Sequence, residues 1–491
     1  MILALLLVPI VAGILVFFSR NRAIDRTLLI VAATAHAGMT ASTWFSTPPP
    51  MFFGWLALDA PGKLFLGITS SLFLAASFYA VGYLRREAEG RKRDLEEGFA
   101  FSNAPEQIFV GALLFFLATM TLVTLSQNMG LIWVAVEATT LASAPLIYFH
   151  RHHRSLEATW KYLLICSVGI ALALLGIFFL AVASACRNGE TSLMLPDLLI
   201  RCSQMDPRWL KASFILLLVG YGTKMGLAPM HTWLPDAHSE APSVVSALLS
   251  GAVLNCAFLG ILRSLQILAS SGQLFFGQDL LMGFGLLSMG VAAVFVIRQP
   301  DFKRLLAYSS VEHMGIVALG VGVGGGGVFG SMLHAVNHSF AKAALFLVAG
   351  NVMTAYKTKF FEKVTGMLKT YPLTSVLWIA GFLAITGSPP FGLFISEFTI
   401  LRAALVQGNF LVATAYLAVL ALIFAAMMAT CLRMTQGVPE QQAQQLPKGE
   451  PMIAVMPPAF LLLVVLVLGV YVPQPLSDTI NEIARSIGGL S

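Results

Sequence analysis

Apolar stretches long enough to cross a lipid bilayer recur along the whole sequence. Of 491 residues, 57% are hydrophobic and only 11% are charged, and the mean hydropathy is +0.81. A spanning helix needs about 20 residues, and lipid offers no hydrogen-bonding partners to an open backbone. The pattern predicts an all-α polytopic membrane protein with about 14 transmembrane helices, in a single membrane domain over residues 1–491. The predicted helices centre near residues 10, 36, 73, 116, 139, 172, 220, 255, 288, 312, 342, 388, 420 and 462.

So little charge in so long a chain excludes a soluble globular domain, and no cofactor motif is present. The cysteines form no C-x-x-C pair, and their spacing suits neither a zinc site nor an iron–sulfur cluster. The glycine run at 324–327 lacks the strand, lysine and serine or threonine of a phosphate-binding loop. We expect no metal, cofactor or redox centre in this chain. The cysteines are interpreted as small membrane residues: Cys166, Cys186, Cys202, Cys256 and Cys431.

Positively charged residues concentrate after every second predicted span. Of the 30 lysines and arginines, 20 lie in the loops after odd-numbered spans and 7 lie in the other loops. Cytoplasmic loops carry such an excess. The odd loops are therefore predicted to be cytoplasmic, with both termini on the opposite side of the membrane. The formal charge of +6 reflects this topology and not nucleic-acid binding.

Two apolar stretches are interrupted by glycine and proline. The first reads GTKMGLAPMHTWLP from Gly222 and contains Pro229; the second reads TGSPPFGLFISEF from Thr386 and contains Pro389 and Pro390. Proline breaks a helix because it removes a backbone donor, and paired broken helices indicate a transporter built from inverted repeats. We predict N-terminal helices at 1–106, two inverted five-helix repeats at 107–268 and 278–435, and a C-terminal helix and tail at 453–491.

Charged side chains inside the apolar stretches are few, and each costs about 2.5–3.5 kcal/mol on insertion scales. Lys224 lies beside the first break, and Glu137 lies in LIWVAVEATTLASAPLIYF. A buried lysine with a carboxylate partner can switch between its charged and neutral forms, so we predict that the two form a proton-relay pair. The alternatives are a neutral packing residue for Glu137 and a snorkelling Lys224. Lys161, at the start of a span, either tunes Glu137 or snorkels to the surface.

A second set of polar residues lies in the other half of the chain. His334, His338 and Lys342 recur every four residues and so share one stripe of a helix. Histidine titrates near neutrality, and no carboxylate sits at metal-binding spacing on this helix. The stripe therefore predicts a proton relay, with structural hydrogen bonding as the alternative. Glu397, in the second broken helix, is predicted to be an exit or coupling group, or else a helix-terminal residue at the interface.

Other polar residues are less specific. Glu312 and His313, in LLAYSSVEHMG, form either part of the relay or a structural polar network. The charged segment 301–304 is expected at the cytoplasmic surface. The segment 231–243, HTWLPDAHSEAPS, could suggest a metal cluster, but it is short and proline-rich, which favours a polar connector that caps helix ends. Its candidate ligands would be Asp236, His238 and Glu240.

Four segments together resemble the antiporter-like subunits of respiratory complex I, which are related to subunits of sodium/proton antiporters and membrane-bound hydrogenases. They are GTKMGLAPMHTWLPDAHSEAPSVVSALLSG, FKRLLAYSSVEHMG, HSFAKAALFLVAGNV and GSPPFGLFISEF. The stretch VEATTLASAPLIYFHRHHRSLEATWKYLL looks most like the F subunit of the hydrogenase-four (formate hydrogenlyase) type. The resemblance implies a fourteen-helix fold with two inverted repeats. It also implies proton translocation, with family roles carried over onto Glu137, Lys224, Lys342 and Glu397.

The sequence departs from this family in the helix after the first broken one. Several members place a lysine or histidine there, whereas the matching stretch, GAVLNCAFLGILR, has Asn255. Asparagine does not titrate, so it can only orient water or form hydrogen bonds. A relay must cross this region through water and the His334/His338 stripe, or it is incomplete.

Three hypotheses follow. The chain is first expected to be a proton-conducting subunit of an energy-converting hydrogenase or a related complex I-like assembly, in the inner membrane of a prokaryote. Iron–sulfur clusters and a nickel–iron centre would then belong to partner subunits, and this chain would serve a redox-driven pump without a redox site of its own. The second hypothesis is an Mrp-type cation/proton antiporter subunit that uses the same charges for sodium. The third is a structural membrane anchor with a vestigial relay.

Overall fold

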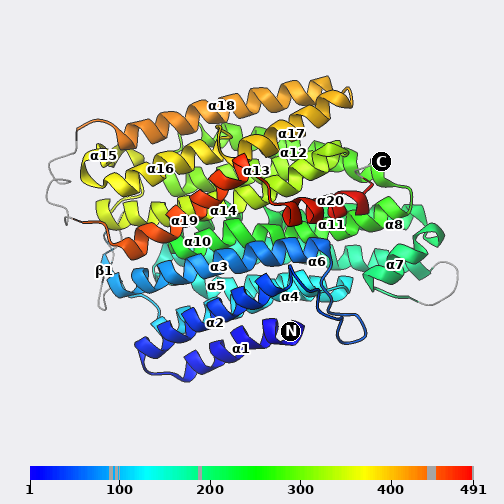
Figure 1. Ribbon diagram of the computed structural model, residues 1–491, viewed down its shortest axis with the longest axis horizontal. Coiled ribbons are helices and arrows are strands. Elements are labelled where there is room, and N and C mark those ends of the chain that lie inside the picture. Colours follow the sequence, from blue (N-terminus) through cyan, green and yellow to red (C-terminus); the bar gives the residue numbers. More distant parts are fainter. Residues whose placement is uncertain (88–91, 94–97, 99, 186–190, 439–448, 489–491) are drawn as a thin grey trace.

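The computed structural model describes residues 1–87, 92, 93, 98, 100–185, 191–438 and 449–488. Its helices lie along a common direction and form one elongated bundle (Figure 1). The N-terminal part contains three long helices and a short antiparallel ribbon: α1 (Ile2–Phe18), α2 (Arg22–Ser42), α3 (Ala60–Arg86), β1 (Lys92–Arg93) and β2 (Ala100–Phe101).

The next part of the chain contains the first broken helix and an irregular one. Its elements are α4 (Glu106–Leu125), α5 (Met129–Ile147), α6 (His153–Ala185), α7 (Leu195–Arg201), the 3₁₀ turn η1 (Cys202–Gln204), α8 (Pro207–Met225), α9 (Trp233–Glu240), α10 (Ser243–Leu248), the π-helical turn η2 (Leu249–Val253) and α11 (Leu254–Ser270). The sequence did not predict η2, which joins α10 and α11 into one bilayer-length rod over Ser243–Ser270.

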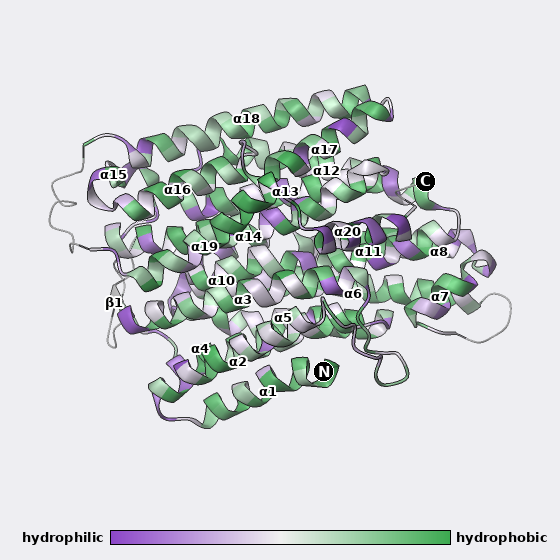
Figure 2. Cartoon of the chain, viewed as in Figure 1, coloured by the Kyte–Doolittle hydropathy of each residue, from purple (hydrophilic) through white to green (hydrophobic). Residues whose placement is uncertain are grey.

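The last part contains the second broken helix and ends in an additional helix. Its elements are α12 (Leu274–Val296), α13 (Phe302–Val323), α14 (Gly326–Tyr356), the 3₁₀ turn η3 (Phe361–Lys363), α15 (Met367–Thr370), α16 (Pro372–Ile385), α17 (Gly392–Val406), α18 (Phe410–Thr435), α19 (Met452–Val470) and α20 (Gln474–Ser486). The expected C-terminal tail is thus helical in α20, which buries Ile480 and Ile483 and leaves polar residues on its other face (Figure 2).

Each predicted span coincides with a helix or with a broken pair of helices, so the polytopic all-α fold is confirmed. Within the described residues, 10 helical segments are long and apolar enough to cross a membrane on their own. Ile2–Phe18 and Pro372–Ile385 are shorter apolar helices. The total of about fourteen spans stays a prediction, because it also counts α1, α2 and the two broken helices, none of which meets both criteria of length and apolar character.

Both predicted helix breaks are present. α8 ends at Gly226, whose φ of 86° is a left-handed conformation that favours glycine, and Pro229 lies in the connection to α9. The second break separates α16 from α17, with Gly387 at φ 64° and Pro389 and Pro390 in the connection. The three prolines are exposed, so the irregular backbone of each break reaches the surface of the bundle.

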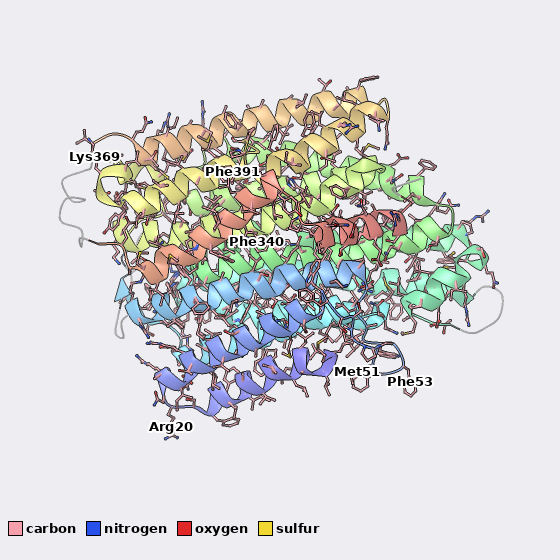
Figure 3. All side chains as sticks on the ribbon, viewed as in Figure 1. Arg20, Met51, Phe53, Phe340, Lys369 and Phe391 are labelled. Carbon is pink, nitrogen blue, oxygen red and sulfur yellow. The ribbon has the colours of Figure 1, made fainter. Side chains whose placement is uncertain are left out.

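The bundle has a buried centre and an apolar rim. α14 packs against α10, α13, α16, α17 and α19, and residues 243–268 are all buried. By contrast, α18 lies at the outer edge with large apolar side chains exposed (Figures 1 and 2). Arg20 and Lys369, from loops after odd-numbered spans, lie at one end, and Met51 and Phe53 lie toward the other (Figure 3). The arrangement is that of an integral membrane protein, with these two cationic loop residues at the same end.

The segment 301–304, expected at the cytoplasmic surface, is only partly exposed, since the Arg304 side chain is 41% exposed. Asp301 and Lys303 are buried, and Lys303 donates hydrogen bonds to the backbone oxygens of Ser239 and Ala241 at 3.2 and 2.5 Å. Asp301 lies 3.7 Å from the ammonium of Lys359. These charges join α9, α13 and the chain after α14, because buried charges need partners to offset their lost solvation.

Candidate functional site

The predicted pair of Glu137 and Lys224 is joined through a hydroxyl group. Lys224, in the last turn of α8, is fully buried and donates a hydrogen bond of 2.9 Å to Thr140 Oγ1 on α5. Thr140 in turn donates to Glu137 Oε2 at 3.2 Å, one turn earlier on the same helix. Ser167 of α6 donates to the other carboxylate oxygen at 3.1 Å. The arrangement is an ammonium and a carboxylate connected by a short hydrogen-bonded chain.

Tyr162 is the second partner of Lys224 and was not among the predicted site residues. Its hydroxyl accepts a 2.5 Å hydrogen bond from the lysine and lies 2.6 Å from Ser143 Oγ. The ammonium also lies 4.4 Å from the centroid of the Tyr162 ring and 5.9 Å from that of Trp233, which favours the charged lysine through cation–π attraction. These contacts hold a charge at a depth where an isolated ammonium would be costly.

Lys161 does not take part in this group. It is 46% exposed and pairs with Glu157 at 2.7 Å and with Asp236 at 3.0 Å. Asp236 also pairs with Arg304 at 2.5 Å. Lys161 therefore lies at the surface between α6 and α9. This agrees with the alternative prediction that its side chain snorkels to the surface.

His238 is a buried residue that sequence reasoning assigned to a polar connector. The segment forms helix α9, and the ring of His238 stacks on Phe346 of α14 at 4.7 Å with an interplanar angle of 12°. Neither ring nitrogen has a hydrogen-bonding partner within the described part of the chain. One feature of the sequence does indicate this burial. His238 is four residues after the apolar Leu234, so both lie on one face of the helix.

Asn255 links the helix after the first break to α14. Its Nδ2 donates to Ser339 Oγ at 2.7 Å and to the backbone oxygen of Gly251 in η2 at 2.9 Å. Its Oδ1 has no partner among the residues described. Nearby, Ser250 of η2 lies 2.8 Å from Ser310 of α13. The position predicted to interrupt a relay is thus a polar junction between the two halves.

Lys342 and Glu312 lie on the two central helices, α14 and α13. Lys342 is fully buried and donates a hydrogen bond of 2.7 Å to the backbone oxygen of Leu306. Glu312 is 3% exposed and accepts from Ser309 at 3.3 Å. Both side chains are buried among membrane helices. There the free-energy cost of burial depends on whether each side chain carries a charge.

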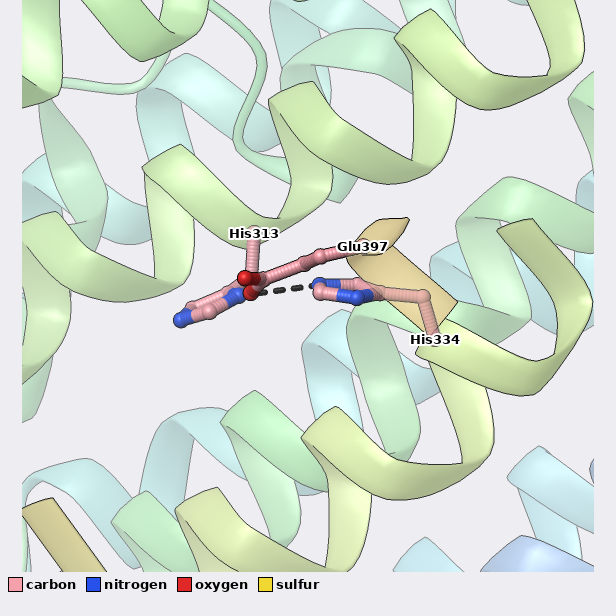
Figure 4. A group of neighbouring side chains, drawn as sticks. All are labelled: His313, His334 and Glu397. Atoms are coloured by element: carbon pink, nitrogen blue, oxygen red, sulfur yellow. Dashed lines mark hydrogen bonds between the residues drawn. The ribbon is translucent and has the colours of Figure 1, made fainter. Parts of the chain in front are cut away.

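Three histidines gather beyond Lys342 and form, with Glu397, what we call the histidine group: His313, His334, His338 and Glu397. His313 Nδ1 and His334 Nε2 are 2.9 Å apart, and His334 Nδ1 lies 3.0 Å from Ser396 Oγ (Figure 4). The ring centroid of His338 lies 5.1 Å from that of His313. Glu397 approaches from α17, so the group combines side chains of three helices.

The second break makes room for the Glu397 carboxylate. A Cβ atom on Gly387 would lie 2.0 Å from Glu397 Oε2, so a side chain at this position would displace the carboxylate. Glu397 also borders a cavity of about 270 Å³ between α17 and α18, to which Tyr416 contributes. The predicted exit residue therefore lies between the histidines and an opening in the side of the bundle.

Polar side chains thus follow one another from Glu137 to Glu397, but direct hydrogen bonds do not connect them all. In the described ranges, none joins the Lys224 group to Asn255, or Lys342 to the histidine group. A proton crossing these gaps needs water or side-chain movement. A larger cavity, of about 480 Å³, opens at the cationic end and is lined by Glu240, Lys303 and Lys359 among others.

The comparisons with known proteins agree on one family. A family model described as NADH:quinone oxidoreductase/Mrp antiporter, TM, matches residues 126–425. The hydrogenase-4 component F homolog of Methylacidiphilum infernorum is 35% identical over 370 residues, covering 74% of this chain and 75% of that protein. Hydrogenase-4 component B of Escherichia coli is 32% identical over 377 residues and covers 74% of this chain, which spans only 52% of that relative.

The fold is likewise similar to that of known membrane complexes. A chain in the structure of the Mrp complex from Dietzia sp. DQ12-45-1b superposes with a TM-score of 0.86 at 19% identity, covering 99% of this chain and 97% of that one. At this identity the likeness concerns the fold alone.

Proposed function

The chain belongs to the family of antiporter-like membrane subunits shared by NADH:quinone oxidoreductase and Mrp antiporters, and within that family we propose that it conducts protons in a hydrogenase-type redox complex. The observation that carries the proposal is the bridge from the buried Lys224 through the buried Thr140 to the half-buried Glu137. An ammonium and a carboxylate joined by a hydroxyl can exchange a proton over short distances. Burial gives such a transfer a large electrostatic effect on neighbouring groups.

The bridge favours protons over sodium. Sodium is a hard cation that would need several of the oxygens around Glu137, but Thr140 Oγ1 already accepts from Lys224 and the Glu137 oxygens already accept from hydroxyls. A second cation here would meet the ammonium at close range and be repelled. The Mrp-type sodium alternative therefore requires Lys224 to lose its proton or move away.

The onward path would run through Asn255, Lys342 and the histidine group to Glu397. The contact of Asn255 with Ser339 gives the two halves a polar junction that can hold water although asparagine does not titrate. We add His238, which is buried on α9 against α14, to the residues of this path. The sequence did not suggest it. The cavity beside Glu240 would admit water at the cationic end, which we assign to the cytoplasm from the positive-inside rule.

In this proposal, electrons stay in partner subunits. The relatives named above are hydrogenase-4 components, so we assign iron–sulfur clusters and a nickel–iron centre to a peripheral arm and proton transfer to this chain. We further place the complex in the inner membrane of a prokaryote, with both termini of this chain on the non-cytoplasmic side.

The ion carried can be tested with the purified complex in sealed vesicles. We expect reductant-driven proton movement, followed by a pH-sensitive dye, to have the same initial rate in sodium-containing and sodium-free buffer. Sodium movement would be measured in parallel with ²²Na⁺. A proton signal that vanishes without sodium, or one that persists in sodium without any reductant, would point to the antiporter alternative.

The position of Glu397 can be tested through Gly387. Alanine there should cost about 1–2 kcal/mol because of the positive φ, and its Cβ would also displace the carboxylate. Gly408→Ala is a matched control, since Gly408 has φ 75° but has no atom within 4 Å of an added Cβ. We expect both variants to lose similar thermal stability and only Gly387→Ala to lose proton transport. Equal transport in the two would show that Glu397 tolerates displacement.

A further inference from the structure

The histidine group has the composition of a metal site. We propose that His313, His334 and Glu397 bind a zinc ion. One ligand atom from each side chain lies within 4.8 Å of the others, and all three residues are buried (Figure 4). The sequence predicts no metal here because α14 alone carries no suitable carboxylate. The fold supplies the carboxylate from α17 and a further imidazole from α13.

The distance between the two imidazole nitrogens needs only a small adjustment to suit zinc, whereas the Glu397 carboxylate, within 4.8 Å of both, would have to move closer. Ligands at about 2.0–2.1 Å in a tetrahedron are about 3.3 Å from each other. His313 Nδ1 and His334 Nε2 are 2.9 Å apart, so the two rings would separate by a few tenths of an ångström. Ser396 Oγ, 3.0 Å from His334 Nδ1, would orient the ring through its second nitrogen, as outer partners of zinc-bound histidines commonly do.

Unpartnered polar atoms point to a ligand at this place. Both ring nitrogens of His338 and Glu397 Oε1 are buried without a hydrogen-bonding partner within the described chain. Buried polar atoms are normally satisfied. His338, whose ring lies 5.1 Å from that of His313, offers an imidazole for a fourth position, which water could also fill.

The donor set selects zinc over hard cations. Two imidazole nitrogens and one carboxylate match the borderline character of zinc, whereas magnesium, calcium and sodium prefer oxygen ligands. Binding requires the imidazoles to be neutral and the carboxylate ionised, so zinc competes with protons for this group.

Zinc binding does not depend on the proposed function, but its consequence does. If protons leave through the histidine group, a bound zinc ion holds two imidazoles and the terminal carboxylate together. They can then neither accept nor release protons. Zinc would therefore be an inhibitor that acts on this chain from its exit side.

The test measures zinc on the intact purified complex by equilibrium dialysis against ZnCl₂, with metal counting by mass spectrometry. We expect wild type to bind one more zinc per copy of this chain than His334→Gln or Glu397→Gln, whose affinity should fall by about 100-fold or more. His36→Gln is the control, because His36 is also buried but pairs with Ser70 and Thr121 on neighbouring helices far along the chain. Thermal unfolding confirms that each variant is folded.

Substitution with cobalt gives a second readout, because the visible absorption of bound Co²⁺ should show nitrogen and oxygen ligands and disappear in both variants. Equal zinc binding in wild type and the two variants would overturn the proposal, as would loss of zinc in His36→Gln alone. Zinc bound at the predicted stoichiometry without inhibition of proton transport would support the site and contradict the proposed exit path.

Discussion

Proton transport by the reconstituted complex is expected to fall to the background of empty vesicles when Lys224 is replaced with methionine. Methionine keeps most of the length and apolar surface of the side chain but cannot carry a proton. Thr140 then loses the donor that connects it to the rest of the site, and Glu137 loses the cation at the other end of the bridge. Electron transfer from the redox partners to a soluble dye should continue, because the change lies within the membrane bundle.

Lys211→Met provides the matched control. Lys211 lies near the start of the same helix, where its ammonium is 5.1 Å from the Phe276 ring, and it has no place in the polar row. We expect the Lys211→Met complex to transport protons at the wild-type rate in a dye-quenching assay with the same amount of complex. Full transport in Lys224→Met would instead favour the structural-anchor hypothesis.

Replacing Asp59 with alanine is expected to lower the free energy of unfolding by about 3 kcal/mol, the lower end of the range for breaking a buried ion pair. Arg263 of α11 is fully buried and donates to Asp59 Oδ1 at 3.1 Å and to Gln127 Oε1 at 2.9 Å. Without Asp59, its charge stays buried and uncompensated. The lower end applies because the Asp59 side chain is 29% exposed, so water can reach it.

Asp59 also caps α3 by accepting a hydrogen bond from Gly62 N. The loss of this cap must therefore be separated from the loss of the ion pair. Asp206→Ala removes an equivalent cap from α8, where the side chain accepts from Arg208 N, and should cost only about 1 kcal/mol. The double variant Asp59→Ala/Arg263→Met should recover part of the loss, since it removes the buried charge. Chemical unfolding in detergent measures all three, and similar losses in the two single variants would contradict the argument.

The sequence was most informative where a property is local. Helices follow from runs of apolar residues, and the breaks follow from Gly226, Pro229 and Pro389, because backbone conformation depends on neighbouring residues. The buried charges could also be chosen in advance, since a charge inside an apolar stretch is costly wherever the helix packs. Glu137 and Lys224 could be selected for this reason, and the structure places them in one group.

The partners of those charges could not be predicted in the same way. Thr140 and Tyr162 are ordinary residues of membrane helices, and only the packing of α5, α6 and α8 makes them the link between Lys224 and Glu137. His238 was misjudged because its burial against Phe346 depends on a contact more than 100 residues away in the chain. The approach of Glu397 to the histidines likewise depends on tertiary structure.

The π-helical turn η2 determines which side of α11 meets α14. A π-turn contains one more residue than an α-turn, and one residue corresponds to about 100° of rotation about the helix axis. Asn255 is the second residue after η2, so it faces Ser339 in a phase that a continuous α-helix from Ser243 would not have. The contact between the two halves is therefore set by a residue count as well as by side-chain chemistry. A helical wheel drawn through the whole rod assigns Asn255 to the wrong side.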